Sequence, residues 1–166
     1  MNPKSVEPVL AHGVTLRPLN EDDLPTTLAW RNHPDSRQWF LTTDEITWDQ
    51  HRQWFENYLV KADDVVFVLD DGERLVAQVA LYNLDDQSAE FGRLLVAPEA
   101  RGQGLSHVAV ELCLRVADEQ LRLDNVVLEV RQDNARAIAA YERAGFVRDD
   151  SARRAADTVV YVRRRP

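Results

Sequence analysis

Two patterns of hydrophobic and polar positions run along this chain of 166 residues. Alternating apolar residues, or short continuous apolar runs, are typical of strands and predict them at 14–19, 65–69, 75–84, 89–96, 126–130, 146–150 and 158–164. Apolar residues spaced by three and four are typical of helices and predict them at 24–32, 47–59, 105–116 and 135–146. This order of elements indicates a mixed α/β fold around one central sheet.

Turn and cap signals mark several of these boundaries. Asn20 before an acidic turn predicts a helix cap, and Thr47 with Gln50 has the spacing of a capping box. Gly72 follows two aspartates and predicts a hairpin, while Gly145 predicts the C-terminal cap of the last helix. These signals support the boundaries that the hydrophobic pattern gives.

Composition narrows the class of protein. Hydrophobic residues make up 45% of the chain and charged residues 29%, as in a soluble globular protein of one domain. The formal net charge of −8 argues against a general nucleic-acid-binding protein. No segment resembles a signal peptide, and no apolar run approaches the ~20 residues of a membrane span. A single cysteine, Cys113, cannot form an internal disulfide, and it falls on an apolar helix face. Together these features lead us to expect a soluble, metal-free, cytoplasmic domain.

The stretch VAPEARGQGLS at 96–106 places two of the chain's six glycines, Gly102 and Gly104, between a predicted strand and a predicted helix. The first N–H groups of a helix lack backbone partners and, with the helix dipole, attract an anion. Glycine lets a phosphate approach the backbone closely, and Arg101 adds a cation. The segment therefore predicts a phosphate or pyrophosphate site, with a plain glycine-rich turn as the alternative.

Two familiar phosphate-binding motifs do not fit this segment. A P-loop would need a lysine after the last glycine, and a dinucleotide-binding fingerprint would need a third glycine where His107 stands. The remaining candidate for the phosphate-bearing ligand is coenzyme A.

Two motifs of the chain resemble those of the GNAT family of N-acetyltransferases. The first is Arg101-Gly102-Gln103-Gly104-Leu105-Ser106, similar to the acetyl-CoA signature R/Q-x-x-G-x-G/A except at Ser106. The second is LEVRQDNARAIAAYERAGF at 128–146, similar to L-x-V-x-x-x-N-x-x-A-I-x-x-Y-E-K-x-G-F. The resemblance covers at least residues 65–162. It implies the GNAT fold, with a single mixed and mostly antiparallel sheet that is splayed at the acetyl-CoA site and flanked by about four helices.

The resemblance also implies acetyl-CoA as co-substrate, without a metal. In the family, backbone N–H groups of the splayed strand hold the pantetheine arm and the thioester oxygen, and by position these belong to Leu94 and Val96. Residues 101–106 would hold the pyrophosphate. Asn134 would contact coenzyme A, although asparagine at this position also suits a helix N-cap.

Catalytic roles follow from the same resemblance. Tyr141 stands where the family has the general acid that protonates the leaving thiolate, and its alternative role is packing. Glu90 and Glu129 are two candidates for the general base, and either could be a hydrogen-bonded strand residue instead. Because Leu128 and Val130 are apolar, Glu129 must face the other side of its strand.

The front half carries a further resemblance. The segments at 29–40 and 45–55 are similar to the GNAT subgroup that N-acetylates UDP-linked 4-amino-4,6-dideoxy sugars in pseudaminic-acid biosynthesis. The likeness includes Trp30, Arg31, Asn32, His33, Pro34, Ile46 and His51. By their chemistry, Arg31 can bind a nucleotide diphosphate, His51 can contact phosphate or sugar, and Trp39 can stack on a base or sugar face. The alternatives are that Arg31 ends a helix near its negative pole and that His51 is a satisfied residue on an apolar stripe.

Three functions therefore stand for one acetyltransferase domain over residues 1–166, with acceptor-binding helices at about 20–60 and a cofactor core at about 65–162. The first is N-acetylation of a small-molecule amine, a nucleotide-linked 4-amino sugar such as a UDP-amino sugar. The second is N-acetylation of a protein N-terminus or an aminoglycoside-like amine. The third is a non-catalytic acyl-CoA-binding sensor. No nucleic-acid or membrane partner is expected, and the oligomeric state is open, a homodimer included.

Overall fold

The computed structural model of the protein describes residues 2–38, 43–152 and 154–166. Its strands are β1 (Val9–Ala11), β2 (Val14–Pro18), β3 (Val65–Asp70), β4 (Leu75–Tyr82), β5 (Ser88–Val96), β6 (Asn125–Arg131), β7 (Val147–Arg148) and β8 (Thr158–Arg164). Its α-helices are α1 (Leu24–Asn32), α2 (Pro34–Arg37), α3 (Trp48–Val60), α4 (Leu105–Arg115) and α5 (Ala135–Arg143). Short 3-10 helices are Pro3–Ser5, Glu21–Asp23 and Pro98–Ala100, and a π-helical turn, Val116–Gln120, continues α4.

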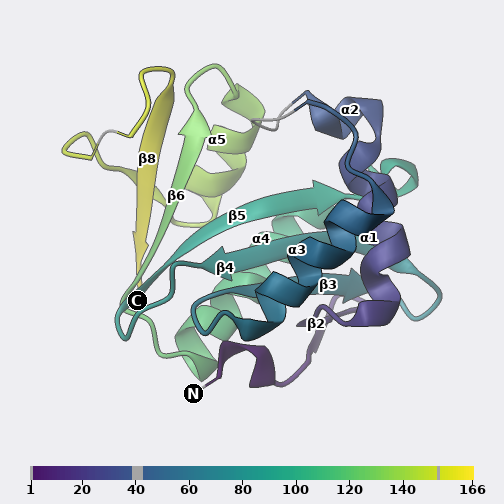
Figure 1. The fold of residues 1–166 in the computed structure, drawn as a ribbon. Coiled ribbons are helices and arrows are strands. Elements are labelled where there is room, and N and C mark those ends of the chain that lie inside the picture. The colour runs from purple at the N-terminus through teal and green to yellow at the C-terminus, as the bar shows by residue number, and fades with distance from the viewer. Residues whose placement is uncertain (1, 39–42, 153) are drawn as a thin grey trace.

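Within the described residues the strands form one eight-stranded sheet in the order β1-β2-β3-β4-β5-β6-β8-β7 (Figure 1). Neighbouring strands are antiparallel except for β5 and β6, which run parallel. The parallel pairing is short, because it joins only residues 88–90 to residues 125–127. Beyond these residues the two strands diverge (Figure 1), so the sheet is splayed near its centre.

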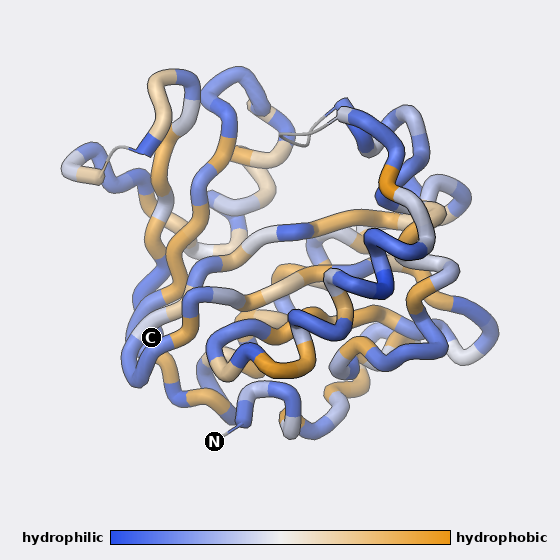
Figure 2. Tube along the Cα trace, in the orientation of Figure 1, coloured by the Kyte–Doolittle hydropathy of each residue, from blue (hydrophilic) through white to orange (hydrophobic). Residues whose placement is uncertain are grey.

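Helices cover the two faces of the sheet unequally. Along β3, Val65, Phe67 and Leu69 belong to a large apolar cluster that includes α4, whereas Val66 and Val68 belong to a smaller cluster with α1 and α3. The apolar positions follow the central strands and the polar positions follow the loops (Figure 2). In the described part of the chain, β6 and β8 have α5 on one face and no helix on the other (Figure 1). That uncovered face lies beside the splay.

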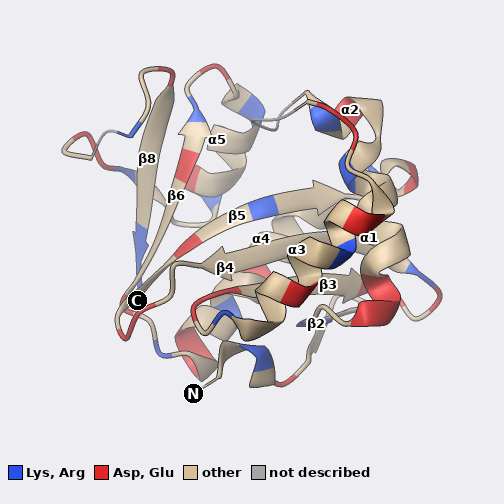
Figure 3. Cartoon of the chain, in the orientation of Figure 1, with Lys and Arg blue, Asp and Glu red and all other residues tan. Residues whose placement is uncertain are grey.

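The structure confirms most of the predicted elements and their caps. Thr47 and Gln50 form the expected capping box at the start of α3, and Gly145 has a φ of 95° after α5. Cys113 is buried in α4 as expected, with no exposed surface. Charged positions of both signs are spread over the loops and helices (Figure 3).

Some sequence-based predictions were wrong. In the helix predicted at 47–59, the spacing of apolar residues puts Leu59 on the buried stripe with Phe55 and Tyr58, but its side chain is 53% exposed because it lies near the end of α3, past the edge of the cluster. β1 and α2 were not predicted, since three and four residues are too few to show a period. The strand expected at 146–150 is only β7, whose two residues are both exposed.

Candidate active site

The glycine loop joins the 3-10 helix Pro98–Ala100 to α4. Gly102 and Gly104 have φ values of 79° and 76°, in the left-handed region that side chains rarely adopt. A Cβ built on either glycine would meet no atom within 4 Å. Backbone conformation therefore requires glycine at both positions, and the space beside them is open to a ligand.

The N-terminus of α4 is the anion-binding end of this loop. Gly104 is the N-cap residue and provides no side-chain cap, so the first N–H groups of the helix have no such acceptor. Gln103 and Ser106 are exposed, and Leu105 is half-buried against the core. Uncapped donors on exposed backbone at the positive end of an 11-residue helix fit a pyrophosphate.

Arg101, predicted to add a cation to this loop, also bonds to α2. Its Nη1 donates to Asp35 at 3.0 Å and its Nη2 to Ser36 Oγ at 3.3 Å. The guanidinium therefore joins the glycine loop to the segment that follows α1, the part of the chain with the second resemblance.

The splay exposes one edge of β5. The N–H of Ala97 donates to Val76 O on β4 at 2.9 Å. Because successive amides point to opposite sides of a strand, the amide of Val96, and that of Leu94 two residues earlier, point away from β4. These are the two residues whose backbone was expected to contact the cofactor. Their side chains are half-buried.

A β-bulge interrupts β5 at the same place. The register with β4 shifts between Gln78 and Ala80, so that two β5 residues, Arg93 and Leu94, lie opposite one β4 residue. Sequence reasoning missed this bulge. The signal that could have found it is Gly92, a glycine inside an otherwise regular strand pattern.

Tyr141 lies on α5 beside the point where β5 and β6 part. Its ring packs edge-on against Phe91, with centroids 5.8 Å apart, and against Phe146 at 5.9 Å. Burial, with a smaller contribution from Tyr82, raises the pKa of the Tyr141 hydroxyl to about 12. The phenol is therefore fully protonated at neutral pH. Asn134 caps α5, because its side chain accepts from the N–H of Ala137 at 3.2 Å.

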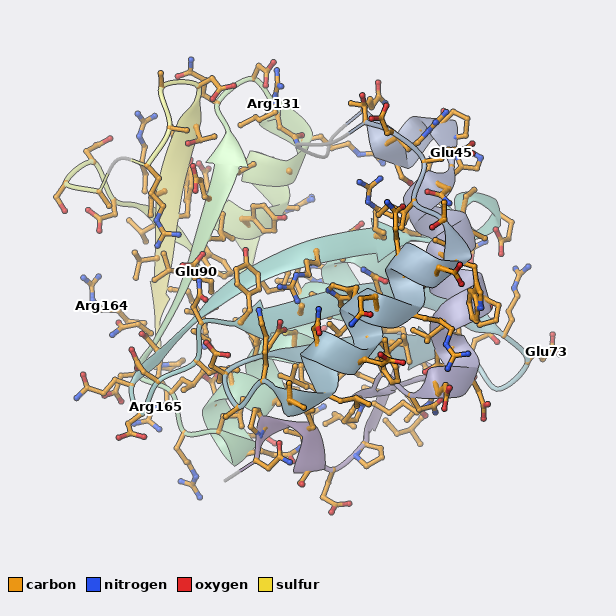
Figure 4. All side chains as sticks on the ribbon, viewed as in Figure 1. Glu45, Glu73, Glu90, Arg131, Arg164 and Arg165 are labelled. Carbon is orange, nitrogen blue, oxygen red and sulfur yellow. The ribbon has the colours of Figure 1, made fainter. Side chains whose placement is uncertain are left out.

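The two candidate bases lie on the uncovered face of the sheet. Glu90 (Figure 4) is the last residue of β5 that pairs with β6, and its carboxylate is 2.7 Å from Arg154 Nη1. Asn83 Nδ2 also donates to Glu90, at 3.0 Å. Glu129 is exposed on β6, faces away from its apolar neighbours as predicted, and accepts from Thr158 Oγ1 at 2.5 Å.

Arg154, from the connection between β7 and β8, links these two carboxylates electrostatically. Its pKa is raised chiefly by the hydrogen bond to Glu90, with a smaller contribution from the charge of Glu129. Sequence reasoning missed Arg154, since 64 residues separate it from Glu90 and no local pattern points to the pair.

Most of the distinctive front segment has a structural role. Asn32 Nδ2 donates to Ile46 O and its Oδ1 accepts from Ile46 N–H, both at 2.8 Å, which closes the loop between α1 and α3. His33 is the N-cap of α2, where its Nδ1 accepts from Asp35 N–H at 3.2 Å. Trp30 is buried in the core, with 4% of its surface exposed.

The three expected substrate residues have different surroundings. His51 is buried, 3.2 Å from Thr27 Oγ1 and stacked on Trp54, and burial lowers its pKa; this is the packing role left open above. Burial and then the charge of Arg37 lower the pKa of Arg31. Trp39 lies outside the described residues.

No group of three or more His, Cys, Asp or Glu side chains that could hold a metal ion occurs in residues 2–38, 43–152 and 154–166. No helix in these same ranges has the length and apolar character needed to cross a membrane.

Comparison with known proteins identifies the family. The acetyltransferase (GNAT) domain model matches residues 14–147. The acetyltransferase PseH of Campylobacter jejuni is 28% identical over 128 residues, which cover 77% of this chain and 79% of that protein. A solved spermidine N-acetyltransferase of Vibrio cholerae, in complex with CoA and spermine, has a TM-score of 0.79 at 24% identity over 92% and 94% of the two chains.

The structure of Campylobacter jejuni PseH with acetyl coenzyme A has a TM-score of 0.73 at 18% identity, covering 92% of this chain and 99% of that one. These matches confirm the predicted fold and co-substrate. Because the family model spans most of the chain, the protein belongs to the GNAT family of acetyltransferases and is an acetyl-CoA-dependent N-acetyltransferase.

Proposed function

We propose that the acceptor is the primary amine of a nucleotide-linked amino sugar. The observation that carries this proposal is the position of Arg31, at the end of α1, near Arg37, at the end of α2; burial and then the charge of Arg37 lower the pKa of Arg31. Arg37 also lies 3.8 Å from Glu45, so the two guanidinium groups form a partly balanced cationic pair that a bound anion would stabilise further. A nucleotide diphosphate suits the planar fork of arginine. The similarity to PseH supports acetyl transfer, and the resemblance of residues 29–40 and 45–55 to the UDP-4-amino-sugar N-acetyltransferases supports an acceptor of this class.

In this proposal each group of the chain has one task. Acetyl-CoA, when bound, supplies the thioester and its acetyl group. The first N–H groups of α4 bind the pyrophosphate, and the amides of Leu94 and Val96 donate to the pantetheine arm and the thioester oxygen. Tyr141 holds a proton on its hydroxyl for the departing thiolate.

We assign the general base to Glu90. Its side chain is 20% exposed, it lies on the strand that carries the open amides, and it is the last residue of that strand to pair with β6. Both carboxylates have hydrogen-bond partners, but Glu129 is more exposed. A partly buried carboxylate beside the splay is better placed to take a proton from an acceptor ammonium than one at the surface.

A second candidate acceptor is a cationic small amine, such as a polyamine or an aminoglycoside. Glu90 and Glu129 on the uncovered face would attract a cation, and the fold likeness includes a spermidine N-acetyltransferase. Against this candidate, Arg154 pairs with Glu90 and its charge also offsets part of that of Glu129.

Coenzyme A release from acetyl-CoA tests the acceptor. The panel is a UDP-linked 4-amino sugar, spermidine, an aminoglycoside and a peptide with a free N-terminus. We expect the highest kcat/KM with the amino sugar. Arg31→Ala should raise the KM for that acceptor about tenfold, the loss of one charge-assisted hydrogen bond, without changing the KM for acetyl-CoA.

The matched control is Arg52→Ala, which removes an exposed arginine of α3 that pairs with Glu21 at 3.7 Å. It should leave both KM values unchanged. Turnover of spermidine or the aminoglycoside alone would favour the second candidate, turnover of the peptide alone would contradict both, and acetyl-CoA binding without turnover of any acceptor would point to a sensor.

A further inference from the structure

The bulge in β5 contains a strained residue. Arg93 has a φ of 54°, in the left-handed region where arginine is uncommon. Glycine or asparagine would occupy this conformation more easily. Such strain persists where the surroundings over-determine it, and it concentrates at functional sites. The side chain of Arg93 is therefore the place to look for what holds the bulge.

Three residues from two parts of the chain, the connection from α3 to β3 and strand β4, hold Arg93. Its Nη1 donates to Asp64 Oδ1 at 2.8 Å, and the Asp64 side chain, in the connection from α3 to β3, is only 3% exposed. Its guanidinium carbon lies over the Tyr82 ring, 4.6 Å from the centroid. Its carbonyl oxygen accepts from Gln78 Nε2 at 3.1 Å. Both the side chain and the backbone of Arg93 are thus anchored.

Gly92 makes room for one of these anchors. A Cβ at this position would lie 2.7 Å from Tyr82 Oη and 3.0 Å from the nearest ring carbon. Tyr82 therefore rests directly on the backbone of β5, with the guanidinium of Arg93 on its ring. The tyrosine at the end of β4 and the buried carboxylate of Asp64 together define where the bulge residue can lie.

The orientation of the next amide depends on this residue. The N–H of Leu94 belongs to the peptide plane that follows Arg93, so a change in the backbone dihedrals of Arg93 turns that N–H. Without its anchors, Arg93 would relax towards the extended region and the peptide plane would rotate.

We propose that Arg93, anchored by Asp64 and Tyr82, is a positioning residue that aims the N–H of Leu94 at the thioester oxygen. The inference rests on the proposed role of Leu94 as a donor in the cofactor site. Arg93 touches neither the acetyl group nor the acceptor in this proposal; it acts through the peptide plane that it holds.

The test compares two non-reactive coenzyme A thioethers by titration calorimetry. One, an S-acetonyl thioether, has a ketone in place of the acetyl group, and the other, an S-propyl thioether, has no oxygen there. We expect the wild-type protein to prefer the ketone. Arg93→Ala should lower this preference at least about fivefold, the effect of one misdirected hydrogen bond. Arg93→Lys, which keeps a cation near Asp64, should restore part of it.

Arg122→Ala is the matched control, because Arg122 is an exposed arginine with a φ of 59° outside the site. It should leave the preference unchanged, since only the backbone strain is shared. Arg93→Ala removes a partner of the buried Asp64 carboxylate and could fail to fold for that reason. In that case the relative affinity for the two thioethers is measured in Arg93→Lys and Asp64→Asn instead.

The outcomes separate the inference from the function on which it rests. A wild-type preference that survives in folded Arg93→Ala, or in Asp64→Asn and Arg93→Lys alike, overturns the positioning role and leaves the cofactor site as proposed. Equal binding of the two thioethers by the wild-type protein overturns both the positioning role and the assignment of Leu94 as a donor.

Discussion

The glycine loop and the front segment present opposite kinds of surface. In the loop, Gly102 and Gly104 have open space where a side chain would be, and the start of α4 has no side-chain cap. In the front segment, around the end of α1, side chains bond to the chain itself: Asn32, the last residue of α1, bonds to both backbone groups of Ile46, and His33 caps α2. One region offers backbone to a ligand, and the other uses side chains to shape a loop.

This difference explains how each region can be interpreted. A ligand held by backbone N–H groups requires unusual dihedrals, and these leave glycines at fixed spacing in the sequence. A ligand held by side chains requires polar residues that also occur as helix caps and loop contacts, so the sequence alone does not distinguish a binding role from a structural one. The cofactor is accordingly the better-defined half of the reaction, and the acceptor is the half that experiments must define.

The largest expected effect is on the cofactor side. Tyr141→Phe should reduce kcat by about 1,000-fold, the middle of the usual range for general-acid catalysis, and leave acetyl-CoA affinity nearly unchanged. Because the pKa of Tyr141 is raised to about 12, the phenol keeps its proton through the usual assay range. Wild-type turnover should therefore show no loss from this group below about pH 10.

Steady-state coenzyme A release from pH 7 to 10 and calorimetry of acetyl-CoA binding check both statements. Unchanged turnover in the phenylalanine variant would leave Tyr141 as a packing residue against Phe91 and Phe146. The cofactor side would then have backbone groups that bind coenzyme A but no side chain assigned as the general acid.

A smaller effect should separate the two carboxylates. Glu90→Gln should lower kcat/KM for the acceptor by about 100-fold near pH 7, and the loss should shrink at higher pH as free amine becomes available. Glu129→Gln should stay within about threefold of wild type, since its carboxylate is exposed.

Arg154→Gln controls for the broken ion pair, because it removes the same contact and keeps Glu90. It should retain most of the activity, as partly exposed pairs are worth only about 0–1 kcal/mol. The reverse ranking of the two glutamine variants would move the base to β6.

The smallest effect concerns the front segment. Burial lowers the pKa of His51 from 6.5, so below that pH the unfolded chain takes up a proton that the folded chain resists. Stability from neutral His51 is thus present above about pH 6.5 and is lost as the pH falls. His51→Gln should weaken this acid dependence by less than about 1 kcal/mol.

Urea unfolding of both proteins at pH 7.5 and 5.5 measures the difference. If both proteins lose the same free energy of unfolding between pH 7.5 and 5.5, His51 does not contribute to the acid dependence of stability. A change in acceptor KM with no change in stability would instead give His51 the substrate role that its burial argues against.

Local signals accounted for most of the fold. Periodicity and caps were enough for elements such as α3, which begins at a capping box, and for the strand–glycine–helix order at 96–106. The bulge at Arg93 was missed because a bulge is a property of the register between two strands, and Gly92 is only a local hint of it. The pairs Glu90–Arg154 and Arg93–Asp64 were missed because 64 and 29 residues separate their members.

Cys113 gives the protein a useful analytical property. It is the chain's single thiol, it lies without exposed surface in α4, and burial raises its pKa, so in the folded protein it is closed to thiol reagents. A chromogenic disulfide added to the folded protein therefore counts the thiol of each released coenzyme A against a blank background. Added during unfolding, the same reagent yields one equivalent per chain and times the opening of the core around α4.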